Sequence, residues 1–106
     1  MRIGIVGGLD RSVRELQERA RAGGHELEVH TGVVNGASAA ASLRSLVARA
    51  DLVVILTDVN SHNGVRLARR HARRRGRPIR MMRRLGVTQL AAFLRSFHPG
   101  DAVAAA

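Results

Sequence analysis

The feature that most constrains this chain is residues 51–57, which read Asp-Leu-Val-Val-Ile-Leu-Thr. The apolar residues follow one another without the alternation expected of a strand that has one face in water. An unbroken aliphatic run of this length is typical of a strand covered on both faces, and such strands belong to parallel sheets. The run therefore predicts the central strand of a parallel sheet.

Strand and helix patterns alternate on both sides of that run. We expect strands at residues 2–8, 25–30, 51–57 and 78–82, each followed by residues with helical periodicity. Gly23-Gly24 and Gly76 are expected to end the first and third helices. The expected helix N-caps are Asp10 or Ser12, Ser38, Ser61 and Thr88.

This order, with right-handed crossovers, predicts a four-stranded parallel sheet of strand order 2-1-3-4. The fold class is then α/β, a single Rossmann-like or flavodoxin-like domain of three layers over residues 1–97. A chain of 106 residues is the size of one domain. Residues 98–106 are mostly small, and we expect a flexible tail there.

Composition excludes several classes of chemistry. The chain has no cysteine, which excludes disulfides, thiolate metal sites and cysteine nucleophiles. No apolar run approaches the ~18 residues of a membrane span, and the first residues read as a strand rather than a signal peptide. We therefore expect a cytoplasmic protein without a membrane partner.

All 18 basic residues are arginine, and the net charge is +10. Such a charge favours anionic partners. A GC-rich genome, whose codons favour arginine over lysine, would give the same excess of arginine, so both explanations stay open.

Ligands of open α/β sheets bind beyond the carboxyl ends of the strands, at the switch point, here between the first and third strands. Gly7-Gly8 and the polar run 58–63 should meet there. His30 ends the second strand and Arg83 follows the fourth. The candidate ligand-binding residues are Gly7, Gly8, His30, Asp58, Ser61, His62, Asn63 and Arg83.

These residue types suit a small anionic or polar ligand. Backbone N–H groups of Gly7-Gly8 and of the helix after Ser61 could face an anion, although a tight turn and a helix cap would use the same residues. The glycines do not space as G-x-G-x-x-G, so a nicotinamide cofactor is not expected. The leading hypothesis is a binding or sensor module. An enzyme that uses His62 as general acid–base, oriented by Asp58, is a less favoured alternative.

Two further alternatives use other residues. A two-histidine, one-carboxylate metal site could be formed from His30, His62 and Asp58 by residue type. However, the first strand lies between the second and the third, so the second and third strands are roughly 10 Å apart. Haem has still less support, because the small core offers no evident pocket. The second alternative is an adaptor for nucleic acid or a protein partner through the third helix, whose arginines could hold phosphates or simply face solvent. Those arginines are Arg66, Arg69, Arg70, Arg73 and Arg74.

The edges of a four-stranded sheet also predict a homodimer. The expected contact surface is the fourth strand or the last helix, with Phe93 and Phe97.

Taken together, these segments resemble a bacterial family known as domain of unknown function 2325. The matching features are Ile5-Val-Gly-Gly8, Gly23-Gly24 with His30-Thr-Gly32, the run 51–58 with Ser61-His-Asn63, and Pro78 with Arg83 to Gly86. The resemblance covers residues 1 to about 97. It implies a Rossmann-like fold and supplies no reaction. The family motif carries over to Gly7, Gly8, His30, Asp58, Ser61, His62 and Arg83 as candidate site residues.

Overall fold

Strands and helices alternate in the computed structural model, which describes residues 1–8, 13–96 and 103–104. Each element of the repeating pattern lies within a few residues of its expected place. The elements are β1 (Arg2–Val6), α1 (Val13–Ala22), β2 (Glu26–His30), α2 (Ala37–Arg49), β3 (Leu52–Leu56), α3 (His62–Arg75), β4 (Pro78–Met82), α4 (Val87–Ser96) and β5 (Val103–Ala104).

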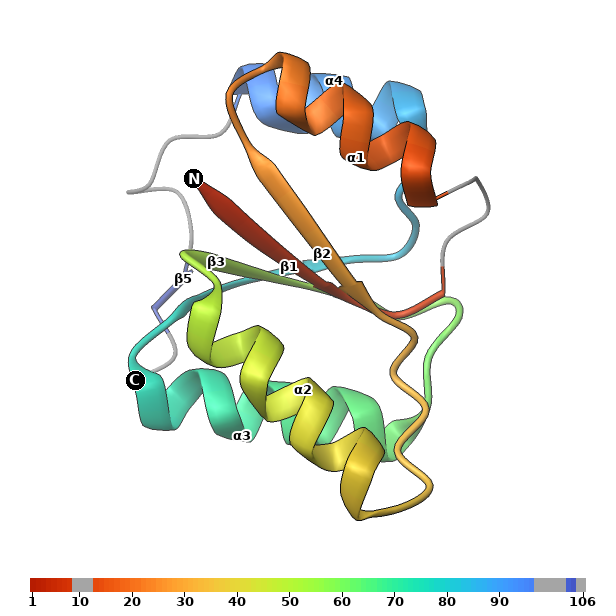
Figure 1. Cartoon of the computed structure of the whole chain (residues 1–106), viewed down its shortest axis with the longest axis vertical. Helices are drawn as coiled ribbons and strands as arrows, with labels where there is room; N and C mark the ends of the chain where they lie inside the picture. Colours follow the sequence, from red (N-terminus) through yellow and green to blue (C-terminus); the bar gives the residue numbers. More distant parts are fainter. Residues whose placement is uncertain (9–12, 97–102, 105–106) are drawn as a thin grey trace.

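The first four strands form a parallel sheet in the order β2-β1-β3-β4. The predicted fold class and strand order are therefore confirmed. In Figure 1 the carboxyl ends of the strands gather at the right-hand side of the molecule. The edge predicted to carry the site thus contains the connections that follow all four parallel strands.

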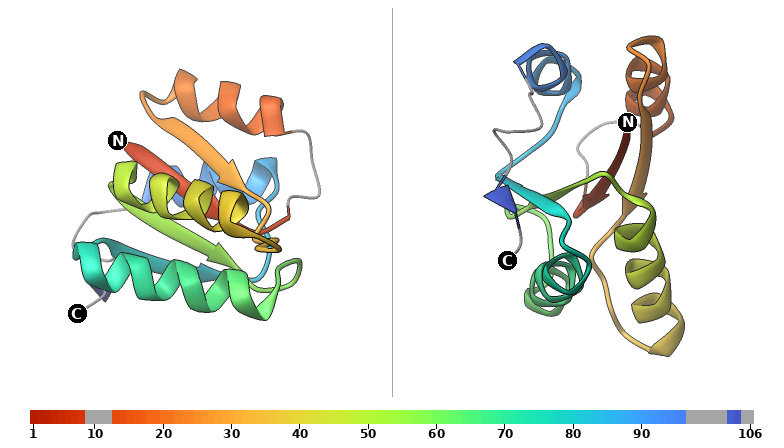
Figure 2. Two further views of the ribbon diagram at one scale, coloured as in Figure 1. Left: turned by 60° about the horizontal axis from the view of Figure 1, so that its bottom comes forward. Right: turned by 90° about the vertical axis from the view of Figure 1, so that its left-hand side faces the viewer.

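Helices cover both faces of the sheet, which gives three layers. α1 and α4 lie on one face, and α2 and α3 lie on the other (Figures 1 and 2). β3 lies between β1 and β4, and all five of its residues are buried. The unbroken apolar run thus corresponds to the central strand.

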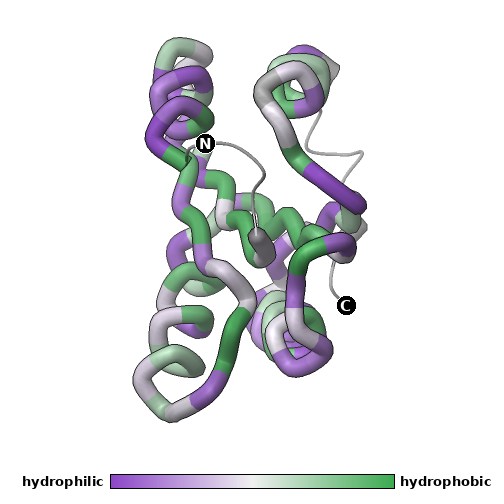
Figure 3. Tube along the Cα trace, turned by 90° about the vertical axis from the view of Figure 1, so that its right-hand side faces the viewer, coloured by the Kyte–Doolittle hydropathy of each residue, from purple (hydrophilic) through white to green (hydrophobic). Residues whose placement is uncertain are grey.

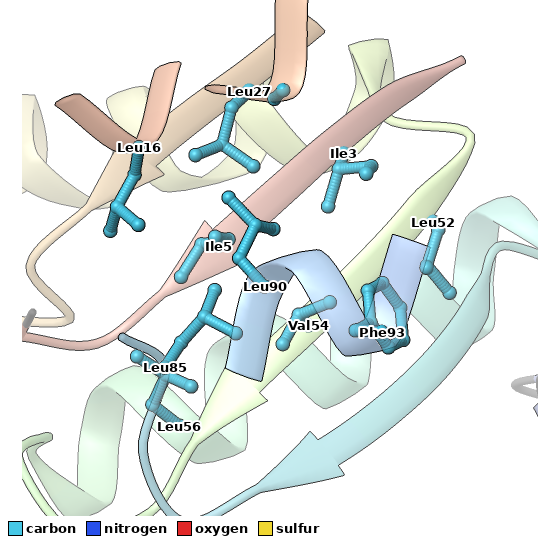
Figure 4. Packing of buried hydrophobic residues seen from close by; sticks show 11 residues of the cluster. Ile3, Ile5, Leu16, Leu27, Leu52, Val54, Leu56, Leu85, Leu90 and Phe93 are labelled. Atoms are coloured by element: carbon cyan, nitrogen blue, oxygen red, sulfur yellow. The ribbon is translucent and has the colours of Figure 1, made fainter. Parts of the chain in front are cut away.

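Alternate residues of β3 contribute to two separate cores. Leu52, Val54 and Leu56 pack in the cluster beneath α1 and α4, which Figure 4 shows together with Leu90 and Phe93 of α4. The odd-numbered residues between them, Val53 and Ile55, pack in the cluster beneath α2 and α3. Both sides of the strand face apolar side chains, which explains why its sequence does not alternate.

Two of the expected helix caps are confirmed. The hydroxyl of Ser61 accepts a hydrogen bond from the Gly64 N–H at 2.8 Å. Gly76 ends α3 in the left-handed conformation, with φ of 64°. Asp10 and Ser12 lie outside the described residues.

The expected caps Ser38 and Thr88 are wrong, because both residues lie inside their helices. α2 begins at Ala37 after Gly36, which provides no side-chain cap. α4 begins at Val87, and the Gln89 side chain accepts from the Gly86 N–H at 3.1 Å. In both cases a glycine precedes the helix, and the helix starts two residues earlier than it would after the expected hydroxyl cap.

The carboxyl-terminal part of the chain differs from the expectation in two respects. Within the expected tail, Val103–Ala104 forms β5, which pairs antiparallel with Pro78 and Ile79 of β4. This pairing uses part of the free edge of the sheet. Phe93, expected on a dimer surface, is only 6% exposed and packs in the core of its own chain, and Phe97 lies outside the described residues.

None of the described helices is long and apolar enough to cross a membrane.

Candidate functional site

The glycine turn after β1 directs its N–H groups into the chain. Gly7 donates to the carbonyl of His30 at 2.8 Å, and Gly8 donates to the carbonyl of Val59 at 2.6 Å. Gly7 has φ of 140°, and a Cβ there would lie 2.7 Å from Leu56. The interpretation of a tight turn therefore holds, and neither donor faces an incoming anion as the alternative required.

Asn60 closes the switch point between β1 and β3. Its amide nitrogen donates to the carbonyls of Val6 at 3.0 Å and Leu56 at 2.7 Å, and so joins the last residues of the two strands. Its side-chain oxygen accepts from the Ser61 N–H at 2.9 Å. Sequence reasoning missed this residue, although an asparagine four residues after a buried strand residue, next to a helix cap, was a usable signal.

The segment after β2 covers the start of α3. The Ser61 hydroxyl donates to the carbonyl of Gly32 at 2.6 Å while it caps Gly64. A Cβ on Gly64 would collide with the Gly32 carbonyl, and a Cβ on Gly32 would collide with Asn60. Figure 1 shows this segment passing the first turn of α3 at the right-hand edge. Close packing therefore fills the place where the sequence predicts a ligand.

His30 fixes the other end of the same segment. Its Nδ1 accepts from the Gly32 N–H at 2.9 Å, and its Nε2 bonds the carbonyl of Ala39 at 3.1 Å. The two partners require the proton on Nε2. Both ring nitrogens are therefore engaged within the chain, and this geometry gives His30 a structural role.

His62 and Asn63 lie exposed in the first turn of α3. Neither side chain makes a hydrogen bond to another described residue. In the part of the chain that the structure describes, no three histidine and carboxylate side chains gather as a metal site would require. His30, His62 and Asp58 thus do not come together as the metal alternative needs.

Asp58 is the predicted residue with the richest surroundings. Arg83 Nε lies 3.3 Å from Oδ1, and Arg84 Nε lies 2.9 Å from Oδ2. The Asp58 side chain is 22% exposed, against 86% for Arg83 and 67% for Arg84. The hydrogen bond from Arg84 is the main cause that holds the pKa of Asp58 below its ordinary value. Both carboxylate oxygens of Asp58 accept from arginines, and no hydrogen bond joins Asp58 to His62 among the described residues.

These three residues line an open cleft of about 490 Å³ at the carboxyl end of β4, together with Met82 and Gln89. Of the predicted site residues, the cleft unites Asp58 and Arg83. Gly7, Gly8, His30 and Ser61 instead build the closed region around Asn60. Sequence reasoning missed Arg84 and Gln89, although Arg84 adjoins Arg83 and Gln89 stands three residues after the glycine that precedes α4.

The arginines singled out on α3 line a second hollow, of about 440 Å³. They alternate with residues that pack inward, among them the buried Ala68 and Ala72. Figure 3 shows hydrophilic stretches on α3 and on the connection between β4 and α4. The residues around this hollow are Arg66, Arg69, Arg70, Arg73 and Arg74.

Fold and surface together define a small parallel α/β domain that carries an arginine-lined cleft at the carboxyl edge of its sheet. Over residues 2–97 the chain matches the family described as "Uncharacterized protein conserved in bacteria (DUF2325)", and it belongs to that family. The resemblance noted in the sequence is thereby confirmed. Comparison with curated proteins and with solved structures gave no match.

Proposed function

We propose that this domain is a binding module for a small anion, which it holds in the cleft formed by Asp58, Arg83, Arg84, Met82 and Gln89. The observation that carries the proposal is the pairing of one carboxylate with two neighbouring arginines at the rim of that cleft. The proposed binding site thus lies at the end of β4, whereas the sequence predicted a site at the switch point between β1 and β3.

The carboxylate supports anion binding because it orients the guanidinium groups. An unpaired surface arginine loses considerable side-chain entropy when a ligand fixes it. Asp58 already holds one nitrogen of Arg83 and one of Arg84. A guanidinium has five N–H donors, so the contact of Arg83 with Asp58 leaves donors for a second oxygen anion. Two positive charges and one negative charge leave the rim cationic.

The guanidinium groups at the rim of the cleft favour phosphate-like groups over apolar ligands. Planar guanidinium groups match phosphate and carboxylate oxygens in bidentate geometry. The lining offers Met82 as an apolar contact, and it offers Gln89, whose oxygen is engaged with Gly86. A volume of about 490 Å³ falls within the range of small-molecule sites.

The test is calorimetric titration of the protein with inorganic pyrophosphate. We expect the double variant Arg83→Gln/Arg84→Gln to bind at least about tenfold more weakly, because hydrogen bonds to charged groups contribute roughly 1.5–3 kcal/mol each. Both side chains are largely exposed, so the variant should fold normally.

The matched control is Arg19→Gln/Arg21→Gln in α1, which removes the same charge. Both residues are exposed and lie in the last turn of a helix that runs back to the opposite edge of the sheet. This variant should keep the affinity of the original protein. An equal loss of affinity in both variants would reduce the effect to net charge and refute the proposal.

A further inference from the structure

The arginine surface of α3 is separate from the cleft at the end of β4. Five arginines line one hollow along this helix: Arg66, Arg69, Arg70, Arg73 and Arg74. Within the described part of the chain, none of these five forms an ion pair, whereas Arg2, Arg49, Arg83 and Arg84 all do. The hollow therefore presents positive charge that the chain itself does not neutralise.

The distribution of acidic residues shows that composition alone does not explain this surface. α1 carries Glu15 and Glu18 among its arginines. α2 and α3 contain no aspartate and no glutamate. A genome rich in arginine codons would raise arginine in both helix layers and would not remove the acids from one of them. The positive charge is thus concentrated on the α2–α3 layer.

Helix stability does not explain the surface either. Cations in the last turn of a helix are favourable, which accounts for Arg73, Arg74 and Arg75. Arg66, Arg69 and Arg70 precede the last turn of α3, and arginines three and four residues apart repel one another. The chain retains a set of like charges that its own fold does not require.

The positive potential extends from α3 to α2. His71 of α3 is close enough to Arg44 of α2 for the charge of that arginine to affect it. Partial burial is the main cause that lowers the pKa of His71, and the charges of Arg44, Arg74, Arg70 and Arg75 lower it further. The two neighbouring helices therefore form one cationic layer.

We infer that the exposed arginine face of α3 is a docking surface for the phosphate backbone of double-stranded DNA, which it contacts without regard to sequence. Arginines at successive turns of a helix can neutralise several phosphates along one strand. This inference concerns a second surface and does not depend on the cleft.

The remaining chemistry of the surface favours a duplex over other polyanions. Single-stranded nucleic acid is bound by exposed aromatic rings on which bases stack. The chain has no tyrosine or tryptophan, and Phe93, the phenylalanine that the structure describes, is buried. Membrane binding by a basic helix needs apolar side chains beside the charges, but those of α3, Val65 and Leu67, pack toward the core.

The experiment is fluorescence anisotropy of the full-length protein with labelled 20-base-pair DNA duplexes of three unrelated sequences, between 50 and 200 mM salt. The three duplexes should bind with similar affinity. If all five arginines contact phosphates, the logarithm of the binding constant should fall with the logarithm of salt concentration with a slope of about −4 to −5. Arg70→Gln/Arg73→Gln should reduce that slope by about 2.

Two other variants separate this surface from net charge and from the cleft. Arg19→Gln/Arg21→Gln on α1 and Arg83→Gln/Arg84→Gln in the cleft should both keep the original slope. A second α3 variant, Arg66→Gln/Arg69→Gln, should repeat the loss and guards against a folding defect in the first. The inference is overturned if the α1 variant loses as much as the α3 variants. Binding to vesicles with anionic phospholipid but not to duplexes also overturns it.

Discussion

Around Gly32 and Gly64 the chain packs so closely that there is no room for a Cβ at either residue. The Gly64 Cα faces the carbonyl of Gly32, and Gly32 in turn faces the Asn60 side chain. The obstacle at Gly64 is backbone, which cannot swing aside as a flexible side chain would. The two glycines thus allow the segment after β2 to lie against α3.

Gly64→Ala should therefore destabilise the protein, by roughly 1–3 kcal/mol or more. In an open helix the same change would stabilise by about 1 kcal/mol, because alanine is the better helix former, so the sign of the effect tests the packing. Gly23→Ala is the matched control. A Cβ there makes only ordinary contacts, the nearest at 3.5 Å, and the change should stay within about 1 kcal/mol. Urea denaturation of both variants measures the difference, and a stabilised Gly64→Ala protein would contradict this account.

Two neighbouring residues of the polar run should behave differently on substitution. Ser61→Ala removes the helix cap and the bond to Gly32 and should cost about 1–2 kcal/mol in the free energy of unfolding. His62→Ala removes an exposed side chain without a described partner and should change it by no more than about 0.5 kcal/mol. Thermal denaturation of the two variants checks the contrast, which fails if His62→Ala costs as much as Ser61→Ala.

At the scale of the elements, sequence signals differed in how well they marked helix ends. The Ser61 hydroxyl caps the Gly64 N–H, and Gly76 ends the helix in the left-handed conformation. Both contacts are local to α3, and local patterns predict such contacts well. By residue type, Ser38 and Thr88 are equally good N-caps. In the structure, however, a glycine directly precedes each helix, and both residues lie inside their helices. Which residue begins a helix there depends on the path of the incoming chain, and that path is set by tertiary packing.

α3 should become more stable when arginines that precede its last turn are removed. Arg66→Gln/Arg70→Gln eliminates like-charge pairs with Arg69, Arg73 and Arg74, each destabilising by about 0.2–0.5 kcal/mol at low salt. The melting temperature should therefore rise in 10 mM salt, and the gain should shrink in 500 mM salt because of screening.

The control for this prediction has the opposite sign. Arg19→Gln in α1 removes a positive charge four residues after Glu15, a spacing at which opposite charges on a helix attract, and should lower the melting temperature slightly at low salt. If the α3 variant melts below the original protein at low salt, its arginines make stabilising contacts and this account of the helix is wrong.

At the scale of the whole molecule, the topology could be predicted from the sequence, but only part of the proposed site could. A central strand of a parallel sheet is covered by helices on both faces, so its residues are apolar without alternation. The aliphatic run of β3 therefore indicates its central place in the sheet. Asp58 and Arg83 were predicted to lie near each other because they follow strands whose ends meet at one edge, and the two side chains are paired in the structure. The pairing of Asp58 with Arg84 and the closure of the switch point by Asn60 depend on side-chain packing between distant segments, which periodicity does not encode.

The pKa of His71 depends on the positive charge that gathers on the α2–α3 layer. Burial and the arginines of two helices lower the pKa of His71 below its usual value of 6.5, so its imidazole should titrate below that pH when followed by NMR. The folded state disfavours the charged ring. The stability that neutral His71 contributes is therefore present above pH 6.5 and lost as the pH falls through the lowered pKa.

Added salt should raise the pKa of His71 toward 6.5 without restoring it fully, because salt screens the arginine charges and leaves the burial unchanged. Arg70→Gln should shift the titration in the same direction, since Arg70 is one of the charges that lower the pKa of His71. Arg19→Gln in the other helix layer should leave the midpoint where it was. A midpoint that ignores both salt and Arg70→Gln would mean that burial alone sets the pKa, and that the two helices do not share one cationic field.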